Sequence, residues 1–175
     1  MIEVYTSEIR NAAKTIKAGD EVLLYGDVIV ARDAVHKRLF PLLGTDKMPI
    51  DIKDKIIYYG GPTPKKGDMP AGAFGPTTSS RMDAYAPAFL QNGLCGMIGK
   101  GNRAKAVYDA IKKYGGIYFC AVGGAGALYA ASTEHLTEVA YTSLGCESLK
   151  IARLNGFYVF CGIDASGRGV FEQPL

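Results

Sequence analysis

Four polar side chains in or near glycine-rich segments could together bind a carboxylate. They are Thr77 and Arg81 in the segment 75–83, Lys100 between two glycines, and Arg32. An arginine can hold a carboxylate through two parallel hydrogen bonds, and a lysine adds a compact positive charge. Thr77 and Arg81 are four residues apart, so on a helix they would share one face. These residue types predict a site for a small anion.

Most of these residues also have an ordinary structural interpretation. Thr77 could be only a helix cap, Arg81 an exposed helix residue, and Lys100 a solvated loop lysine. Arg32 is different, because it opens a predicted helix directly after a strand, where the helix dipole disfavours a cation. His36 lies one helical turn further on and could share the face of Arg32, which makes it a further candidate for substrate binding.

Three glycine-rich turns provide a second reason to expect an anion site. The turns 75–78, 99–102 and 123–126 each lead from a predicted strand into a predicted helix. Such turns direct unpaired N–H groups and the positive end of the helix dipole towards the space beyond the strand. The alternative is that these glycines serve only tight turns and close packing.

Nucleotide-binding motifs do not fit these turns. For Lys100 to belong to a P-loop, position 94 would have to be glycine and position 101 serine or threonine, but they are Leu94 and Gly101. A dinucleotide fingerprint that begins at Gly124 fails at Tyr129.

The elements that must position these residues alternate between strand and helix. This order predicts an α/β fold, in one domain over residues 1–175, with at least part of the sheet parallel. A capped helix is expected from Thr6, with a single bulged strand or two short strands at 21–29. Further strands are expected at 54–59, 71–74, 94–98, 117–122, 138–141, 158–163 and 170–172, and helices at 32–43, 82–91, 103–114 and 127–133.

Composition excludes several classes of protein. The net charge is only +3, from 20 basic and 17 acidic residues, so neither a nucleic acid nor a membrane surface is an expected partner. No apolar run is long enough to cross a membrane and the N-terminus does not resemble a secretory signal, so a cytoplasmic location is expected. The four cysteines contain no C-x-x-C pair, so no metal site is predicted in this chain.

Five segments follow one another along the chain: Gly26–Arg38, Tyr59–Pro64, Gly75–Asp83, Met97–Gly101 and Val122–Leu128. In this order they resemble those of a known family, the β region of class I fumarases and L-tartrate dehydratases. The resemblance covers residues 10–165 approximately. It implies a swivelling β/β/α domain with a mixed sheet.

The resemblance also implies a cofactor and a partner. In this family a separate α region holds a [4Fe-4S] cluster on three cysteines, and its open iron binds the substrate. The chain would then be the β subunit of a hydro-lyase that reversibly hydrates fumarate to malate, inactive without its cluster-bearing α subunit. An α2β2 assembly or a homo-oligomer is expected.

The family's functional residues correspond to positions already described. Arg32, Thr77, Arg81 and Lys100 would bind the dicarboxylate, and Thr77, Arg81 and Lys100 would also be catalytic. Thr77 would transfer the proton, which requires activation because a free alcohol is a very poor base.

Two alternatives remain at this point. The same chemistry could act on L-tartrate or another hydroxy-dicarboxylate, because residues that recognise carboxylates do not determine what lies between them. In a different class, the chain could be a non-catalytic carboxylate-binding or regulatory subunit.

Overall fold

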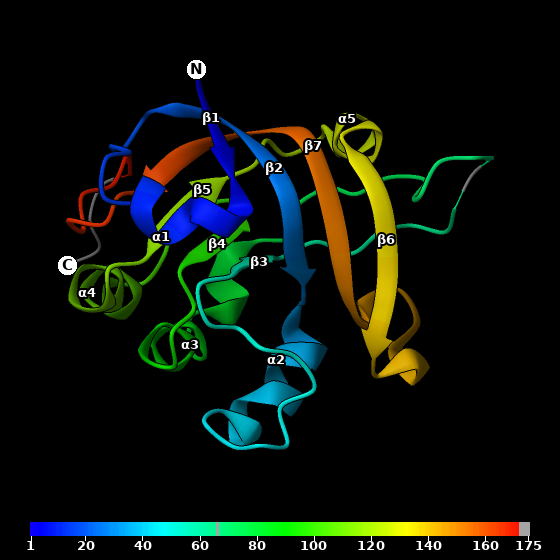
Figure 1. Ribbon diagram of the computed structural model, residues 1–175, viewed down its shortest axis with the longest axis horizontal. Coiled ribbons are helices and arrows are strands. Elements are labelled where there is room, and N and C mark those ends of the chain that lie inside the picture. Colours follow the sequence, from blue (N-terminus) through cyan, green and yellow to red (C-terminus); the bar gives the residue numbers. More distant parts are fainter. Residues whose placement is uncertain (66, 172–175) are drawn as a thin grey trace.

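Short apolar runs form a seven-stranded sheet in a computed structural model that describes residues 1–65 and 67–171 (Figure 1). The strands are β1 (Ile2–Tyr5), β2 (Glu21–Val30), β3 (Ile56–Tyr58), β4 (Gly96–Gly99), β5 (Ile117–Cys120), β6 (Thr133–Ala140) and β7 (Leu149–Ile163). The α-helices are α1 (Ile9–Ala12), α2 (Asp33–Leu39), α3 (Ala86–Gln91), α4 (Lys105–Tyr114) and α5 (Gly126–Ala131). The 3-10 helices are η1 (Thr6–Glu8), η2 (Phe40–Leu42), η3 (Ser79–Met82) and η4 (Thr142–Glu147).

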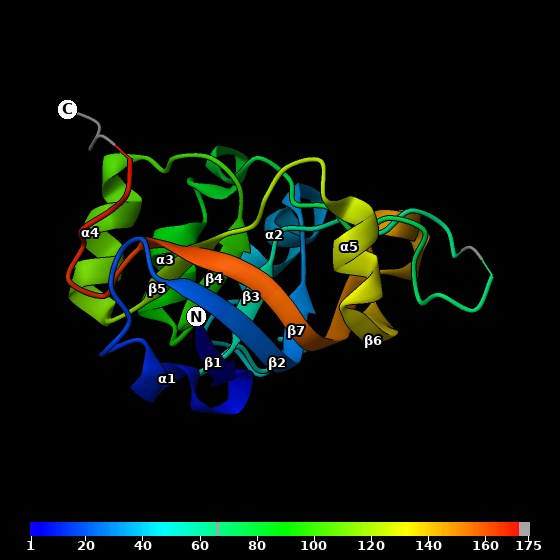
Figure 2. The ribbon, with the colours of Figure 1, turned by 90° about the horizontal axis from the view of Figure 1, so that it is seen from above.

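The sheet is mixed, as predicted, and part of it closes on itself. The strand order is β1-β2-β3-β4-β5-β7-β6, and the neighbours from β1 to β5 are all parallel. β7 runs antiparallel to β5 and β6, and its other edge pairs with β2. Because β7 contacts both β2 and β5, strands β2, β3, β4, β5 and β7 form a closed ring (Figure 2).

Alternation along the strands creates two hydrophobic cores. Ile98 belongs to one core with Tyr58 and Phe157, while its neighbour Met97 belongs to the other with Tyr59. This is expected because successive side chains of a strand point to opposite faces. The second core includes buried residues of α2, α3 and α4, so these helices cover the face of the sheet that carries Met97.

The N-terminal part contains the predicted bulged strand and a shorter helix than expected. β2 changes its register with β7 between Leu24 and Gly26, which confirms the bulge. Gly26 has a φ of 106°, and a Cβ there would lie 2.6 Å from Thr6 Oγ1, so the bulge and the close approach of η1 both require glycine. The expected helix from Thr6 is reduced to η1 and α1.

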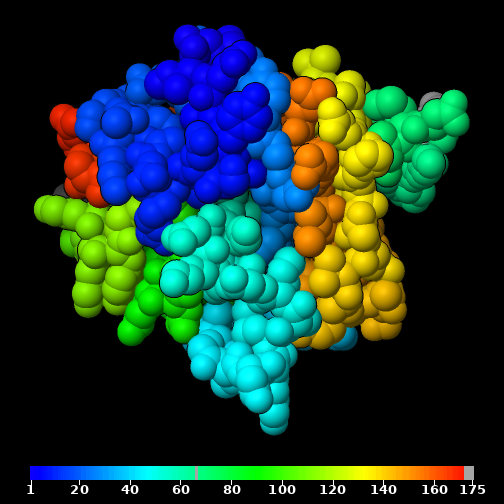
Figure 3. All heavy atoms as spheres, viewed as in Figure 1, coloured from blue at the N-terminus to red at the C-terminus, as the bar shows by residue number. Residues whose placement is uncertain are grey.

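The predicted strand at 71–74 is wrong. This segment has no strand structure, and the residues after it form only isolated bridges, between Gly60 and Pro76 and between Thr78 and Lys100. Prolines at 62, 64, 70 and 76 supply no N–H group to a strand ladder, which explains why a continuous ladder does not form. The exposed residues 63–65 and 67–69 of this connection project beyond β6 (Figures 1 and 3).

Strand β1 was not predicted, and the remaining elements differ from prediction mainly in length. β6 and β7 are longer than the strands expected at 138–141 and 158–163. Residues 170 and 171 of the predicted strand at 170–172 are not in a strand, and Glu172 lies outside the described residues. An isolated bridge joins the preceding residue Gly169 to Ile163. None of the helices in residues 1–65 and 67–171 is long and apolar enough to cross a membrane.

Candidate functional site

The carboxyl ends of four parallel strands meet at one edge of the sheet. Val30 of β2 pairs with Tyr58 of β3, which pairs with Ile98 of β4, which in turn pairs with Phe119 of β5. The segments that follow these residues therefore emerge side by side. They contain Arg32, Gly60-Gly61, Lys100 and the turn 123–126, and this is the edge where ligands of α/β sheets bind.

Arg32 reaches across from the end of β2 to the end of β3. Its guanidinium lies against Gly61, where a Cβ would be 2.6 Å from Nη1, so a larger residue there would displace the Arg32 side chain. Its Nε lies 3.4 Å from a carboxylate oxygen of Glu147, and its side chain is 22 % exposed. The helix predicted from Arg32 begins one residue later, so Arg32 is the extended residue immediately before α2.

Arg81 joins the same region through a carboxylate. One of its guanidinium nitrogens donates to Asp33, the first residue of α2, and half of the Arg81 side chain is exposed. Thr77, however, lies outside η3, which begins at Ser79. The inference that Thr77 and Arg81 share a helical face is therefore wrong.

Backbone pairing, rather than a helix, places Thr77. Its N–H donates to the carbonyl oxygen of Tyr59 at 2.6 Å, directly beyond β3. The next residue forms a parallel bridge with Lys100, and the Ser79 N–H donates to the Lys100 carbonyl at 2.9 Å. Segment 77–79 thus lies between the ends of β3 and β4. Thr77 pairs with the residue after β3, and Thr78 and Ser79 pair with Lys100, the residue after β4.

The side chain of Lys100 extends towards the end of β5. A Cβ on Gly123 would lie 3.7 Å from its Cδ and 3.9 Å from its Nζ, which is ordinary van der Waals contact. Lys100 has no carboxylate within ion-pair distance among the residues described. Its charge is therefore available to a ligand.

The glycine-rich turns differ from their predicted role as helix starts. The turn 75–78 leads only into the 3-10 helix η3, and α4 begins at Lys105, three residues after the turn 99–102. Only the turn 123–126 runs directly into an α-helix, the short α5. The cations named above, rather than helix dipoles, therefore dominate the charge at this edge.

His36 lies beneath Arg32 and is 1 % exposed. Its ring packs against Tyr59, Tyr85 and Phe89. Burial lowers its pKa to about 4, although a hydrogen bond to Arg32 partly opposes this shift. Nδ1 lies 2.9 Å from the Arg32 carbonyl oxygen, which can only accept, so the neutral ring carries its proton on Nδ1.

Three of the four cysteines lie in surroundings that disfavour a metal or cluster, while Cys146 is exposed. Cys95, Cys120 and Cys161 are buried, and burial raises their pKa values, to about 11 for Cys95 and Cys120. A metal ligand must be the thiolate, which these environments disfavour. In the described part of the chain, no group of three or more His, Cys, Asp or Glu residues could hold a metal ion.

Three charged residues of this region were not predicted from the sequence. Asp33 pairs with Arg81, and Glu147 pairs with Arg32. The Arg103 side chain, three residues after Lys100, is fully buried. Asp33 and Glu147 resemble ordinary surface carboxylates in sequence, and Arg103 looked like the first residue of a helix. An arginine two residues after the Gly-Lys-Gly turn was the only available signal.

Comparison with known proteins identifies the chain's relatives. Residues 1–174 match the family model described as the fumarase C-terminus. The chain belongs to this family. It is 40% identical over 153 residues to the anaerobic class I fumarate hydratase of Escherichia coli, covering 86% of this chain but 28% of that protein. It is 34% identical to fumarate hydratase 2 of Leishmania major, covering 96% of this chain and 30% of that protein.

A relative of similar length carries a different name. The putative L(+)-tartrate dehydratase subunit beta of Methanocaldococcus jannaschii is 32% identical, and the match covers 91% of this chain and 86% of that subunit. The chain thus spans less than a third of the fumarate hydratases it matches, but most of a single subunit in this relative. The predicted family and the mixed α/β fold are both confirmed.

Proposed function

We propose that the chain is the β-type part of a [4Fe-4S] hydro-lyase that reversibly adds water to fumarate to form malate, and that a partner chain holds the cluster. The observation that carries this proposal is the convergence of Arg32, Thr77, Arg81 and Lys100 at one sheet edge, in a member of the fumarase C-terminus family. Burial of Cys95, Cys120 and Cys161, which disfavours their thiolates, supports placing the cluster on the partner rather than on this chain.

The three cations have complementary roles in binding a dicarboxylate. Arg32 and Arg81 are already oriented by Glu147 and Asp33, and these pairs are partly exposed, so exchanging one carboxylate for another costs little. Lys100 contributes a charge that none of the described carboxylates neutralises. Together they bind the two carboxylates and stabilise the negative charge that develops when the C–H bond of malate breaks.

Thr77 is the proposed proton-transfer residue. Its alcohol must be made more acidic before it can accept a proton as an alkoxide, and neighbouring cations do this by stabilising the negative oxygen. The backbone bond from Thr77 to Tyr59 fixes the residue beyond the end of β3, in the region where the cations converge. In the hydration direction, Thr77 returns the proton to carbon.

His36 stays a predicted substrate-binding residue. Its buried, neutral ring contacts Arg32 through that residue's carbonyl oxygen, which favours an influence on the substrate through Arg32. It would keep the start of α2 in place while the Arg32 guanidinium binds the carboxylate.

A tartrate dehydratase is the second candidate, because the relative of matching length bears that name. The test is anaerobic co-expression with a cluster-bearing α-type chain, followed by assays of the purified pair with malate and with L-tartrate. Formation of fumarate from malate supports the first proposal, and preferential dehydration of tartrate supports the second. A pair that retains an intact cluster but acts on neither substrate, nor on other hydroxy-dicarboxylates, would contradict both.

A further inference from the structure

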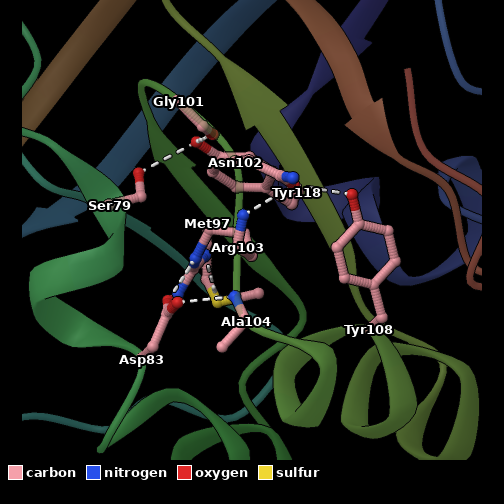
Figure 4. A network of polar contacts seen from close by, with 9 residues as sticks. All are labelled: Ser79, Asp83, Met97, Gly101, Asn102, Arg103, Ala104, Tyr108 and Tyr118. Atoms are coloured by element: carbon pink, nitrogen blue, oxygen red, sulfur yellow. Dashed lines mark hydrogen bonds and ion pairs between the residues drawn. The ribbon is translucent and has the colours of Figure 1, made fainter. Parts of the chain in front are cut away.

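The side chain of Arg103 is completely buried directly below the candidate site. Its Nε donates to Asp83 Oδ1 at 2.6 Å, and Nη1 lies 3.6 Å from the sulfur of Met97 (Figure 4). The guanidinium carbon lies 4.8 Å from the ring centroid of Tyr118 and 5.4 Å from that of Tyr59. A buried arginine is costly unless its charge is compensated, so its retention here calls for an explanation.

The contacts of Arg103 join the segments that carry the proposed ligands of the substrate. Asp83 follows η3, which contains Arg81, and its second oxygen accepts from the Ala104 N–H at 2.7 Å. The arginine and its carboxylate therefore tie the Arg81 segment to the loop that follows Lys100.

Tyr118 extends this connection to the turn after β4. Its hydroxyl lies 2.8 Å from the Gly101 carbonyl oxygen and 2.9 Å from Ser79 Oγ (Figure 4). Because the carbonyl can only accept, the phenol donates to Gly101 and the Ser79 hydroxyl donates to the phenol. The Arg103 guanidinium over the Tyr118 ring thus supports residues that flank both Thr77 and Lys100.

Tyr59 links Arg103 to Thr77. Its ring packs against Arg103, and its carbonyl oxygen holds the Thr77 N–H. Its buried hydroxyl has no hydrogen-bond partner among the residues described, and the same is true of Arg103 Nη2. Burial acts to lower the pKa of Arg103, but Tyr59, Asp83 and Tyr118 raise it above its ordinary value, so the group stays charged.

We propose that Arg103 is a positioning residue for the dicarboxylate site, which places Arg81, Lys100 and Thr77 without touching the substrate. The proposal rests on the proposed function for its kinetic test only. The reason is geometric: Arg103 contacts Asp83 and the rings of Tyr59 and Tyr118, and each of these is linked to a segment bearing one of the three residues. A shift of about 1 Å in such groups can cost about 100-fold in rate.

The test is Arg103→Met in the co-expressed two-chain protein, with Arg10→Met as the matched control. Arg10 forms a comparable bond to Asp54 at 2.7 Å, but its other contacts are the carbonyl oxygens of Gly93 and Tyr114, residues that precede β4 and β5. Arg103→Met is expected to raise KM and lower kcat/KM by about 10- to 100-fold, whereas Arg10→Met should leave kcat/KM within about 3-fold. Equal losses in the two variants would overturn the proposal.

Two further measurements keep the test decisive. If Arg103→Met does not fold, Arg103→Lys keeps a charge but cannot reproduce the planar contacts, and the same rise in KM is expected. Amide hydrogen exchange reports positioning without any turnover. In the Arg103 variant the amides of Thr77, Ser79 and Ala104 should exchange at least about 10-fold faster, with little change in the Arg10 variant.

These readouts separate the two proposals. A wild-type pair that turns over no substrate counts against the proposed function, while faster exchange at the three amides still supports Arg103 as the residue that positions them. Unchanged exchange at these amides in both Arg103 variants would overturn the positioning role even if the wild-type pair is active.

Discussion

The two edges of the parallel strands are each held by an arginine–carboxylate pair, but they leave very different surfaces. At the amino edge, Arg10 bonds Asp54 and the carbonyl oxygens of Gly93 and Tyr114, so all of its interactions close connections between elements. At the carboxyl edge, Arg103 is buried with Asp83, while Arg32, Arg81 and Lys100 are less buried and lie beyond the strand ends.

The two edges differ in what their positive charges contact. At the amino edge, Arg10 bonds a carboxylate and two backbone carbonyl oxygens. At the carboxyl edge, the buried Arg103 holds two loops together through Asp83. Arg32, Arg81 and Lys100 can then remain at the surface to bind a ligand.

The strongest contrast is expected between two adjacent threonines at the carboxyl edge. Thr77→Ala in the reconstituted pair should lower kcat by about 100- to 10,000-fold, the range of general acid–base catalysis. Thr78→Ala should change it little, since Thr78 is exposed and only its backbone pairs with Lys100. Steady-state kinetics of both variants provide the measurement, and near-normal turnover by Thr77→Ala would remove it as the proton-transfer residue.

The buried histidine below this edge should make stability depend on pH. The pKa of His36 is about 4 in the folded chain against 6.5 ordinarily, so between these values the unfolded chain binds a proton that the folded chain does not. The contribution of His36 to the free energy of unfolding is therefore fully present above pH 6.5 and decreases towards pH 4, by about 3 kcal/mol.

Urea unfolding at a series of pH values measures this effect. His36→Gln should flatten the slope between pH 6.5 and 4, whereas His135→Gln serves as a control at an exposed position. A slope that survives in His36→Gln would assign the dependence to other groups.

Mutation of Arg10 at the amino edge should lower the free energy of unfolding but leave kcat/KM nearly unchanged. Arg10→Met removes one partly exposed ion pair and two bonds to carbonyl oxygens, and a loss of about 1–3 kcal/mol in the free energy of unfolding is expected. Urea unfolding and turnover of the same preparation give the comparison. A large loss of kcat/KM in correctly folded Arg10→Met would break the distinction between the two edges.

Much of the carboxyl edge could be predicted because its signals are local. Apolar runs followed by Gly-Gly, Gly-Lys-Gly or Gly-Gly-Ala-Gly indicate strand ends, and a cation after a strand is visible in Arg32. The resemblance to the family then joined residues that no single motif connects. Their meeting at one edge follows from the parallel registers of β2 to β5.

What could not be predicted depends on contacts distant in sequence. Asp83 and Arg103 are twenty residues apart, and Arg32 and Glu147 are separated by more than a hundred, so no local pattern reveals either pair. The error at Thr77 has a related cause. The spacing from Thr77 to Arg81 fits a helix. The chain at 77–79 instead pairs with the residues just beyond β3 and β4, whose backbone groups are partners that sequence spacing cannot indicate.

The most direct test of the central claim compares one lysine at each edge. Lys100→Met and Lys55→Met remove the same charge from the reconstituted pair, the first beyond the end of β4 and the second before the start of β3. We predict that Lys100→Met lowers kcat/KM for the dicarboxylate by about 100-fold or more, with Lys55→Met close to the wild type. Equal kcat/KM values in the two variants would contradict the assignment of the carboxyl edge as the substrate site.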